Sequence, residues 1–459
     1  MEKSTFLVLL LLLSAVAFHL GRKRSLAVAG GSVRNLHSLP SYYGYYTALW
    51  CGIPTLLLLF FWLCFEGKLV TDLVVSGLPE SMRSADPDRL GLLVNDIRNV
   101  ASHSVAEGAD PAIRAAAERY LHYHAFSNIL LSLLGVCLAL AGAAFAYQRI
   151  ACEHRARNQV ERVLRMFLIG CSVLAIFTTI GIVLSVLFES IRFFQKVPIT
   201  EFLFGLKWSP QMAIRADQVG SSGAFGAVPL ITGTLLISFI AMVVAVPIGL
   251  LSAIYLSEYA GSRFRAIAKP LLEILAGIPT VVYGFFAALV VAPFVRDLGA
   301  HLGLVVSSES ALAAGFVMGI MIIPFVSSLS DDFINAVPQS LRDGAYALGA
   351  TQAETIRQVV MPAALPGIVG GVLLAVSRAI GETMIVVMAA GLTANLTANP
   401  LEAVTTVTTQ IVTLLVGDQE FDSPKTLAAF ALGLVLFLLT LVLNIVALHV
   451  VRKYREQYE

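Results

Sequence analysis

An arginine and a glutamate lie inside a long apolar stretch, residues 365–391, where a charge is costly. They are Arg378 and Glu382, four residues apart, so in a continuous helix both side chains would lie on one face. If this stretch crosses a bilayer, the pair must face a water-filled path or a partner. In one hypothesis the pair lines a path, and Glu382 holds Arg378 in place when that path is empty. In the other it is a structural ion pair that locks two helices. Composition does not separate the two.

The polar stretch 329–364 also has an unusual pattern, because a short helix is predicted in its middle. Pro338 can open this helix, and Gly349 is placed to end it, since glycine tolerates the left-handed conformation. Three apolar residues fall on one face of the helix: Leu341, Ala345 and Leu348. Nothing in lipid requires such a face in a polar loop, so we expect it to dock into a groove of a partner.

A second short helix is predicted after the glycine. Thr351 and Glu354 have the spacing of a capping box that opens a helix. We expect Pro362 to stop this helix, because proline lacks the amide proton that a helix interior needs. The stretch is therefore predicted to be a helix–glycine turn–helix.

Patterns typical of catalysis or metal binding are missing from the sequence. Gly67-Lys68 is the only Gly-Lys pair and does not fit a Walker A motif, so any ATP is bound by another subunit. The five cysteines contain no CxxC pair, and their odd number does not support a disulfide framework. His122 and His124 lack a third ligand. We predict no catalytic residue and no metal site.

The composition is that of a membrane protein. Of the 459 residues, 57% are hydrophobic and 13% are charged, and the mean hydropathy is +0.81, whereas about 25% of the residues in soluble proteins are charged. This excludes an ordinary soluble enzyme and intrinsic disorder. The net charge is +1, so no nucleic-acid partner is expected.

Nine apolar runs are near the length that crosses a bilayer as a helix. They cover residues 5–20, 46–65, 126–147, 166–188, 229–255, 270–295, 309–328, 365–391 and 426–451. We predict an all-α polytopic membrane protein with about nine transmembrane helices. Two pairs of glycines spaced four apart predict close helix packing: Gly315 with Gly319, and Gly367 with Gly371.

Lysine and arginine are unevenly distributed between the two sets of loops, which predicts the orientation. Counting short loops, the richer set holds Arg22, Lys23, Arg24, Arg34, Arg149, Arg155, Arg157, Arg162, Arg165, Arg263, Arg265, Lys269, Arg342, Arg357, Arg452, Lys453 and Arg455. We expect this set in the cytoplasm, with the C-terminus cytoplasmic and the N-terminus outside. The alternative, a signal peptide cleaved after Ala17, would invert every later loop.

The chain is predicted to divide near residue 165. Residues 1–165 form an N-terminal extension with three spans, no membrane-embedded charge pair, and an external segment at 66–125. Two acid–proline pairs predict two short helices in that segment: Asp86-Pro87 and Asp110-Pro111. Residues 166–459 form a core with six spans and all the unusual chemistry.

The loop at 329–364 resembles the EAA loop of ABC importer permeases, whose pattern is Glu-Ala-Ala, three residues, Gly, nine residues, Ile-x-Leu-Pro. The corresponding residues are Asp343-Gly344-Ala345, Gly349 and Val359-x-Met361-Pro362, with conservative departures at Asp343, Gly344, Val359 and Met361. The resemblance implies a six-helix, MetI-like permease core. It also implies a loop that couples to an ATPase subunit through Asp343, Gly344, Ala345, Gly349, Thr351, Glu354 and Pro362.

Three further stretches resemble phosphate permeases of the PstC type. They lie at 193–195 with 207–210, at 273–284 and at 377–384. The resemblance covers roughly residues 166–451, and the first 165 residues are more weakly similar to the N-terminal extension of longer PstC proteins.

The resemblance implies a permease subunit of an ATP-driven phosphate importer in the bacterial inner membrane. Its partners would be a PstA-like permease in a heterodimer, two PstB-like ATPase subunits and a PstS-like periplasmic phosphate-binding protein. Phosphate would pass Arg378 and Glu382, and this chain would bind no cofactor, with ATP and Mg²⁺ on the ATPase. The alternatives are a permease for another oxyanion, such as sulfate or molybdate, or a secondary transporter or channel.

Overall fold

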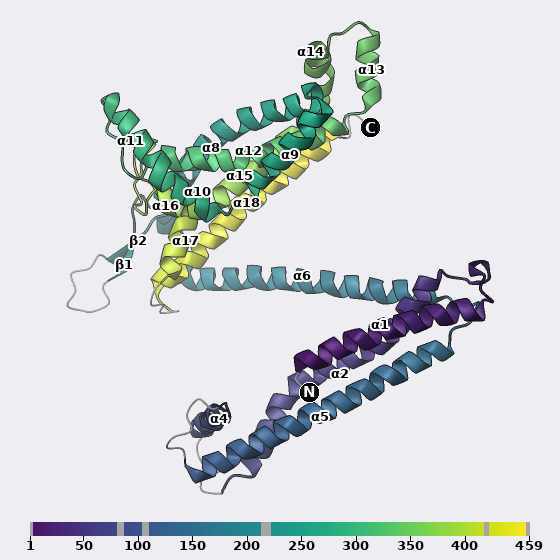
Figure 1. Ribbon diagram of the computed structural model, residues 1–459. Coiled ribbons are helices and arrows are strands. Elements are labelled where there is room, and N and C mark those ends of the chain that lie inside the picture. The colour runs from purple at the N-terminus through teal and green to yellow at the C-terminus, as the bar shows by residue number, and fades with distance from the viewer. Residues whose placement is uncertain (1–2, 80–86, 103–109, 213–221, 417–421, 456–459) are drawn as a thin grey trace. The chain divides into compact units, whose positions relative to one another are not determined.

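The computed structural model describes residues 3–79, 87–102, 110–212, 222–416 and 422–455. Within these ranges nearly every element is a helix, and nine helices are long and apolar enough to cross a membrane (Figure 1). The prediction of an all-α polytopic membrane protein is therefore confirmed. The chain forms two compact units, Met1–Phe177 and Thr178–Glu459.

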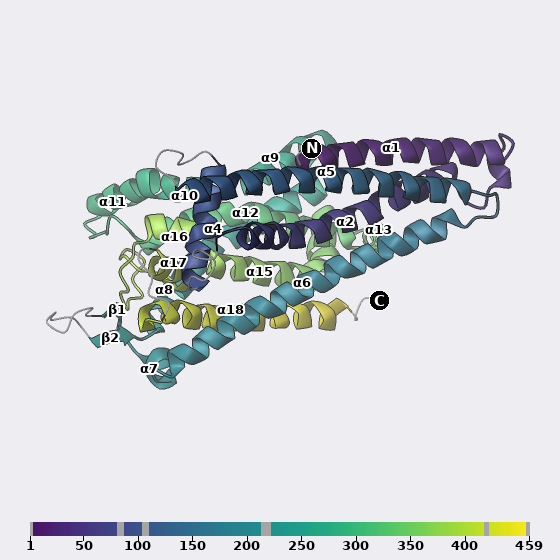
Figure 2. The same cartoon turned by 90° about the horizontal axis from the view of Figure 1, so that it is seen from below.

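The first unit is a bundle of long helices. Its elements are α1 (Lys3–Val28), η1 (Val33–Asn35), α2 (Pro40–Ser76), α4 (Pro87–Ala101), α5 (Pro111–Gln148) and the first part of α6 (Ala156–Phe194). The helices α1, α2 and α5 run side by side, as Figures 1 and 2 both show. The amphipathic α4 packs its apolar side against the ends of α2 and α5.

The two helices predicted from the acid–proline pairs have different outcomes. Asp110 caps α5 as expected, and its carboxylate accepts a hydrogen bond from the amide of Ala112 at 3.0 Å. However, α5 continues without a break into the third span, so no separate second helix forms. A helix also begins at Pro87 as expected, but Asp86 lies outside the described residues.

The second unit holds the remaining elements. They are α7 (Ile199–Phe204), β1 (Trp208–Met212), β2 (Ser222–Phe225), α8 (Val228–Ile254), η2 (Tyr255–Tyr259), α9 (Ser262–Ala276), α10 (Thr280–Phe286), η3 (Ala287–Val291), α11 (Ala292–His301), α12 (Ala311–Ala336), α13 (Gln339–Ala347), α14 (Gln352–Thr355), η4 (Ile356–Val360), α15 (Met361–Gly381), α16 (Met384–Ala389), α17 (Val407–Leu415) and α18 (Pro424–Arg455). The strands β1 and β2 pair antiparallel, with Trp208 opposite Phe225.

The centre of this unit is α12, which packs against α8 on one side and α15 on the other. The predicted glycine pairs lie at these contacts. A Cβ atom on Gly315 or Gly319 would lie 2.8 Å from the Cβ of Ile240 or Val244 of α8, and Gly367 of α15 faces the ring of Phe333. The prediction of close packing is confirmed, because any larger residue would push the helices apart.

Two of the nine predicted runs are not continuous helices. The run 270–295 breaks at residues 277–279, where Pro279 begins the new helix α10. The run 365–391 breaks after Gly381, because the backbone of Glu382 is extended (φ −70°, ψ 134°). The helices that follow the two breaks, α10 and α16, pack against each other, with Gly284 facing Met384 and Met388.

Candidate coupling loop and translocation path

The loop between α12 and α15 folds as a helix–glycine turn–helix. The helix α13 follows Pro338, and Gly349 comes directly after its C-cap with a φ of +87°, the left-handed conformation that the sequence predicted. Thr351 and Glu354 form the predicted capping box: the amide of Glu354 donates to the Thr351 hydroxyl at 3.4 Å, and the amide of Thr351 donates to the Glu354 carboxylate at 2.8 Å. The capping box therefore stabilises the start of α14, directly after the glycine turn.

A buried arginine, Arg342, fixes this loop to the core. Its guanidinium donates to the carbonyls of Val337 at 2.6 Å and Ile334 at 2.8 Å, and to the carboxylate of Glu258 at 3.0 Å. Both carbonyls lie at the C-terminal end of α12, where helices leave acceptors unpaired. The Gln352 side-chain amide adds a bond of 2.6 Å to the backbone carbonyl of Glu258. Sequence reasoning counted Arg342 only as a loop charge and missed this role.

Three large apolar side chains of α13 and its C-cap are exposed in the part of the chain that the structure describes. Leu348 is 91% exposed, Leu341 44% and Tyr346 41%, while the small Ala345 between them is buried. No atom lies within 4 Å of a Cβ built on Gly344, and Asp343 pairs only with Gln339 one turn earlier, at 3.1 Å. An apolar face of this kind on a polar loop is typical of a docking surface.

Pro362 does not stop the second helix, so that prediction is wrong. The short α14 passes into the π-helical turn η4, and α15 begins at Met361 with Pro362 in its first turn. The π turn before Pro362 interrupts the regular α-helical hydrogen bonds, so the proline is accommodated there without ending the helix. The loop is therefore connected to α15 by continuous helix.

An ionic cluster joins α9 to the same end of α12. Asp331 accepts from Arg265 at 2.9 Å, from Lys269 at 2.9 Å and from the Asn335 side chain at 2.9 Å. The hydrogen bond to Asp331 raises the pKa of Lys269. A carboxylate that is only 5% exposed is stable here because three donors surround it. The cluster fastens α9 beside the coupling loop.

Arg378 and Glu382 do not share a helical face, which contradicts the sequence prediction. Since α15 ends at Gly381, Glu382 lies in the break, and its carboxylate accepts from the amide of Met384 at 3.1 Å. Among the described residues no carboxylate forms an ion pair with Arg378, whose guanidinium lies over the ring of Phe325, 5.6 Å from its centre. Arg378 is exposed at the surface of this unit.

A buried polar network, which sequence reasoning missed, holds the break at Glu382 in place. The Thr408 hydroxyl donates to the backbone carbonyl of Glu382 at 2.8 Å. Gln410 donates to the carbonyl of Leu392 and accepts from the indole of Trp208, both at 2.9 Å. Its signal in the sequence was the threonine-rich run Thr405-Thr406-Val407-Thr408-Thr409-Gln410, because buried hydroxyl and amide groups need hydrogen-bond partners.

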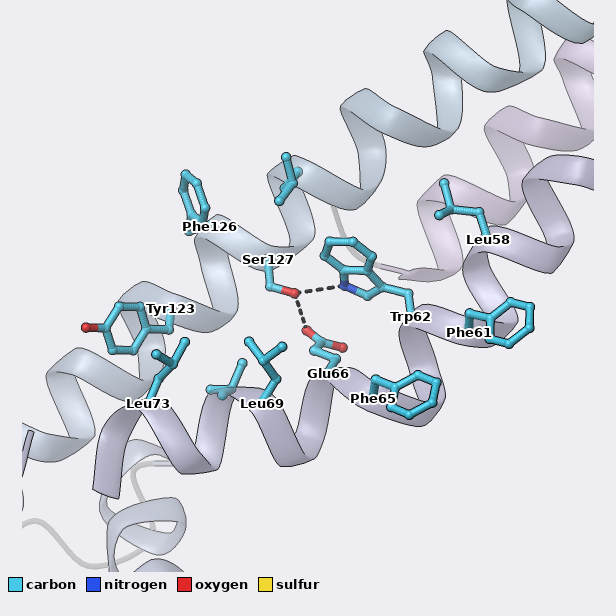
Figure 3. Close-up of a pocket in the computed structure, with 12 residues that line it drawn as sticks. Leu58, Phe61, Trp62, Phe65, Glu66, Leu69, Leu73, Tyr123, Phe126 and Ser127 are labelled. Carbon is cyan, nitrogen blue, oxygen red and sulfur yellow. Dashed lines mark hydrogen bonds between the residues drawn. The ribbon is translucent and has the colours of Figure 1, made fainter. Parts of the chain in front are cut away.

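The first unit contains an ion pair with a buried carboxylate, which lies just beyond the predicted spans rather than within them. The Glu66 carboxylate accepts from the Lys3 ammonium at 2.6 Å and from the Ser127 hydroxyl at 2.8 Å, and the His124 ring lies 3.7 Å away. Trp62 donates its indole proton to Ser127 at 2.9 Å (Figure 3). The Glu66 side chain is 5% exposed. One carboxylate therefore links α1, α2 and α5.

This pair was missed because its members are far apart in the sequence. Lys3, Glu66 and His124 each lie just beyond one of the first three apolar runs, where single charges are ordinary. Beside the pair is an apolar pocket of about 440 Å³. Figure 3 shows its wall of aromatic and leucine side chains, including Phe65 and Phe126.

Comparison with known proteins gives two family matches. Residues 7–178 match the family described as a phosphate ATP-binding cassette transporter, and residues 245–456 match the binding-protein-dependent transport system inner membrane component. A probable ABC transporter permease protein, YqgH of Bacillus subtilis, is 33% identical over 289 residues, which cover 62% of this chain and 89% of that protein.

Phosphate transport system permease proteins are also similar. PstC 1 of Mycobacterium bovis is 34% identical over 251 residues, 50% of this chain and 73% of that protein. PstC of Haemophilus influenzae is 37% identical over 153 residues, 30% of this chain and 49% of that protein, so the match spans about half of that relative. Among solved structures, a chain of a bacterial ABC transporter involved in alginate import is 15% identical, with a TM-score of 0.45, and the likeness covers 64% of this chain and 99% of that chain.

The fold, the loop and the family matches define a multi-pass membrane permease of the ABC-importer class. The chain belongs to the family of phosphate transport permeases of ABC importers. Permeases of this family are transport subunits rather than enzymes. Neither a permease for another oxyanion nor a secondary transporter or channel is favoured by these matches.

Proposed function

We propose that this chain forms half of the phosphate path of an ATP-driven importer and receives movement of an ATPase through the loop at 329–364. Permeases of this class work with a second permease, ATPase subunits and a periplasmic binding protein. The partners proposed here are a PstA-like permease, two PstB-like ATPases and a PstS-like binding protein. The observation that carries the proposal is a short helix, α13, that is fixed to the core by a buried arginine and carries exposed apolar side chains at Leu341, Tyr346 and, at its C-cap, Leu348.

The coupling mechanism follows from the contacts of the loop. An ATPase groove would cover Leu341, Tyr346 and Leu348, which this chain leaves exposed. When the ATPase subunits close, α13 would move with them. Arg342 ties α13 to η2, which continues α8, through Glu258, and to the end of α12 through two carbonyls. The movement would therefore reach the spanning helices rather than bend the loop.

The path itself is assigned to the surface that carries Arg378. A guanidinium exposed on a spanning helix, without a carboxylate partner among the described residues, must meet a partner or a water-filled path. Its planar fork matches the geometry of phosphate oxygens. Glu382 is not the counter-ion of Arg378, because its carboxylate accepts a hydrogen bond from the amide of Met384, the first residue of α16.

ATP and Mg²⁺ are assigned to the ATPase subunits, and this chain is proposed to bind no cofactor. The orientation remains as the basic loops predict, in the inner membrane, with the C-terminus and the loop 329–364 cytoplasmic and the N-terminus periplasmic. The division into an extension (1–165), with its external segment at 66–125, and a permease core (166–459) is retained in the proposal.

Leu348→Asp tests the docking. It places a charge where an apolar groove must close, without touching Arg342. In proteoliposomes with all partner subunits, we expect phosphate uptake and co-purification of the ATPase to fall at least tenfold. Glu153→Gln, on another loop of the basic set, is the control and should behave like the wild type. Normal uptake by Leu348→Asp would contradict the docking role.

A further inference from the structure

The first unit contains a second pocket. It opens between α2 and the start of α6 and has a volume of about 420 Å³, within the range of ligand sites. One wall is apolar, with Trp50, Ile53 and Pro54 from α2 and Val163 from α6. Trp50 is 40% exposed, so its indole borders the opening. The site can hold a hydrocarbon chain.

The other side of the pocket is cationic. Arg149, just after the end of α5, keeps its guanidinium over the ring of Phe145, 4.4 Å from its centre, and Arg162 lies on the second turn of α6. Both are exposed, and no carboxylate of the described chain lies within ion-pair distance of either. Glu161, next to Arg162 in sequence, is bound to Arg157 at 2.6 Å. Two positive charges therefore lie beside the apolar wall, and no carboxylate of the described chain pairs with them.

A ligand that fits both the apolar wall and the cationic side of this pocket must itself have an anionic part and an apolar part. A free phosphate ion would leave the apolar wall in contact with water, and an uncharged lipid would leave both guanidinium groups unpaired. The same end of the unit carries further basic residues at the end of α1, which attract anionic lipids to this leaflet: Arg22, Lys23 and Arg24. We propose that this pocket binds a phospholipid with an anionic headgroup, its phosphate on Arg149 and Arg162 and an acyl chain along Trp50 and Ile53.

Lipid titration of the purified full-length chain tests the site. Binding of phosphatidylglycerol is followed by native mass spectrometry, with phosphatidylcholine for comparison. In the proposed site each guanidinium pairs directly with the lipid phosphate and contributes roughly a fivefold change in affinity, so Arg149→Gln/Arg162→Gln should weaken the first bound phosphatidylglycerol about 30-fold. The matched control Arg34→Gln/Arg155→Gln removes the same charge but changes no residue that lines the pocket, so the affinity for the first bound phosphatidylglycerol should stay within about twofold of the wild type.

A third variant distinguishes binding in the pocket from attraction by the two positive charges alone. Val163→Trp fills the pocket and keeps both arginines, so it should also lose the lipid while a thermal unfolding midpoint confirms that it folds. Equal weakening in both arginine pairs, or full binding by Val163→Trp, would overturn the proposal in favour of general surface attraction. Inorganic phosphate at millimolar concentration should not displace the lipid. Displacement by phosphate would show a free-anion site instead.

Discussion

Arg342 of α13 and Glu258 of η2, 84 residues apart in the sequence, form an ion pair of 3.0 Å in which both side chains are about nine-tenths buried. The pair joins a helix of the coupling loop to the end of a spanning segment. A buried pair is weak evidence for stability, since desolvation opposes it, but breaking it strands a charge. Because the Arg342–Glu258 pair joins the coupling loop to a spanning segment, we expect its main role to be the transmission of movement.

Arg342→Met should therefore lose uptake and also stability, by about 3–5 kcal/mol, because Glu258 stays buried without a partner. Arg342→Met/Glu258→Met should recover most of the stability, as judged by thermal unfolding of the purified chain, but not phosphate uptake. Restored transport in the double variant would show that the pair serves folding alone.

Gly349→Val should uncouple ATP hydrolysis from uptake. The φ of +87° is strained for a β-branched residue by about 1–2 kcal/mol, so the turn between α13 and α14 would shift. The measurement is ATP hydrolysed per phosphate imported in proteoliposomes. Gly344→Ala is the control, because its Cβ would meet no atom within 4 Å and its φ is not positive. An unchanged ratio in Gly349→Val would remove the turn from the mechanism.

Arg378→Gln should abolish phosphate uptake without loss of assembly, because no ion pair within the described chain depends on this guanidinium. Adding Glu382→Gln should not rescue transport, since the Glu382 carboxylate accepts from the amide of Met384 and does not compensate Arg378. Complex yield measures assembly, and Arg263→Gln, exposed on α9, is the control. A well-assembled double variant with near wild-type uptake would defeat the path assignment.

Lys3→Met and Glu66→Gln should show coupling in a double-mutant cycle on thermal stability. Loss of Lys3 alone leaves a carboxylate buried with only Ser127 as a close donor, at a cost of about 2 kcal/mol, which is below the usual range because Lys3 is 36% exposed. The double variant should regain more than half of that loss. If the stability losses of the two single variants simply add, the 2.6 Å ion pair between Lys3 and Glu66 contributes no coupling energy to the bundle.

The glycine turn and the capping box of the loop could be predicted from the sequence because each depends only on residues that are near neighbours in the chain. Gly349 in the left-handed turn and the Thr351–Glu354 capping box need only residues three or four positions away. The spans followed from hydrophobic runs for the same reason. Pro362 was misjudged because a single π turn moved it into the first turn of the next helix.

The long-range contacts could not be predicted. Lys3 pairs with Glu66 across 63 positions, and Arg342 with Glu258 across 84, and no periodicity links such residues. The spacing of Arg378 and Glu382 suggested a shared face only if the helix continued, and the break is held by Thr408, whose role depends on tertiary contact. A run of apolar residues does not reveal where a helix ends within it, as α15 does at Gly381.

The central claim is that α13 seats on an ATPase subunit and moves with it. A photo-reactive amino acid at Leu348 of the chain, in the purified importer with its partners, tests it directly. We predict a cross-link to the ATPase subunit whose yield changes when ATP hydrolysis is arrested, and no such product from the same group at Asn95 of α4. Cross-links to lipid or to the periplasmic binding protein from Leu348, with no ATPase product, would contradict the account.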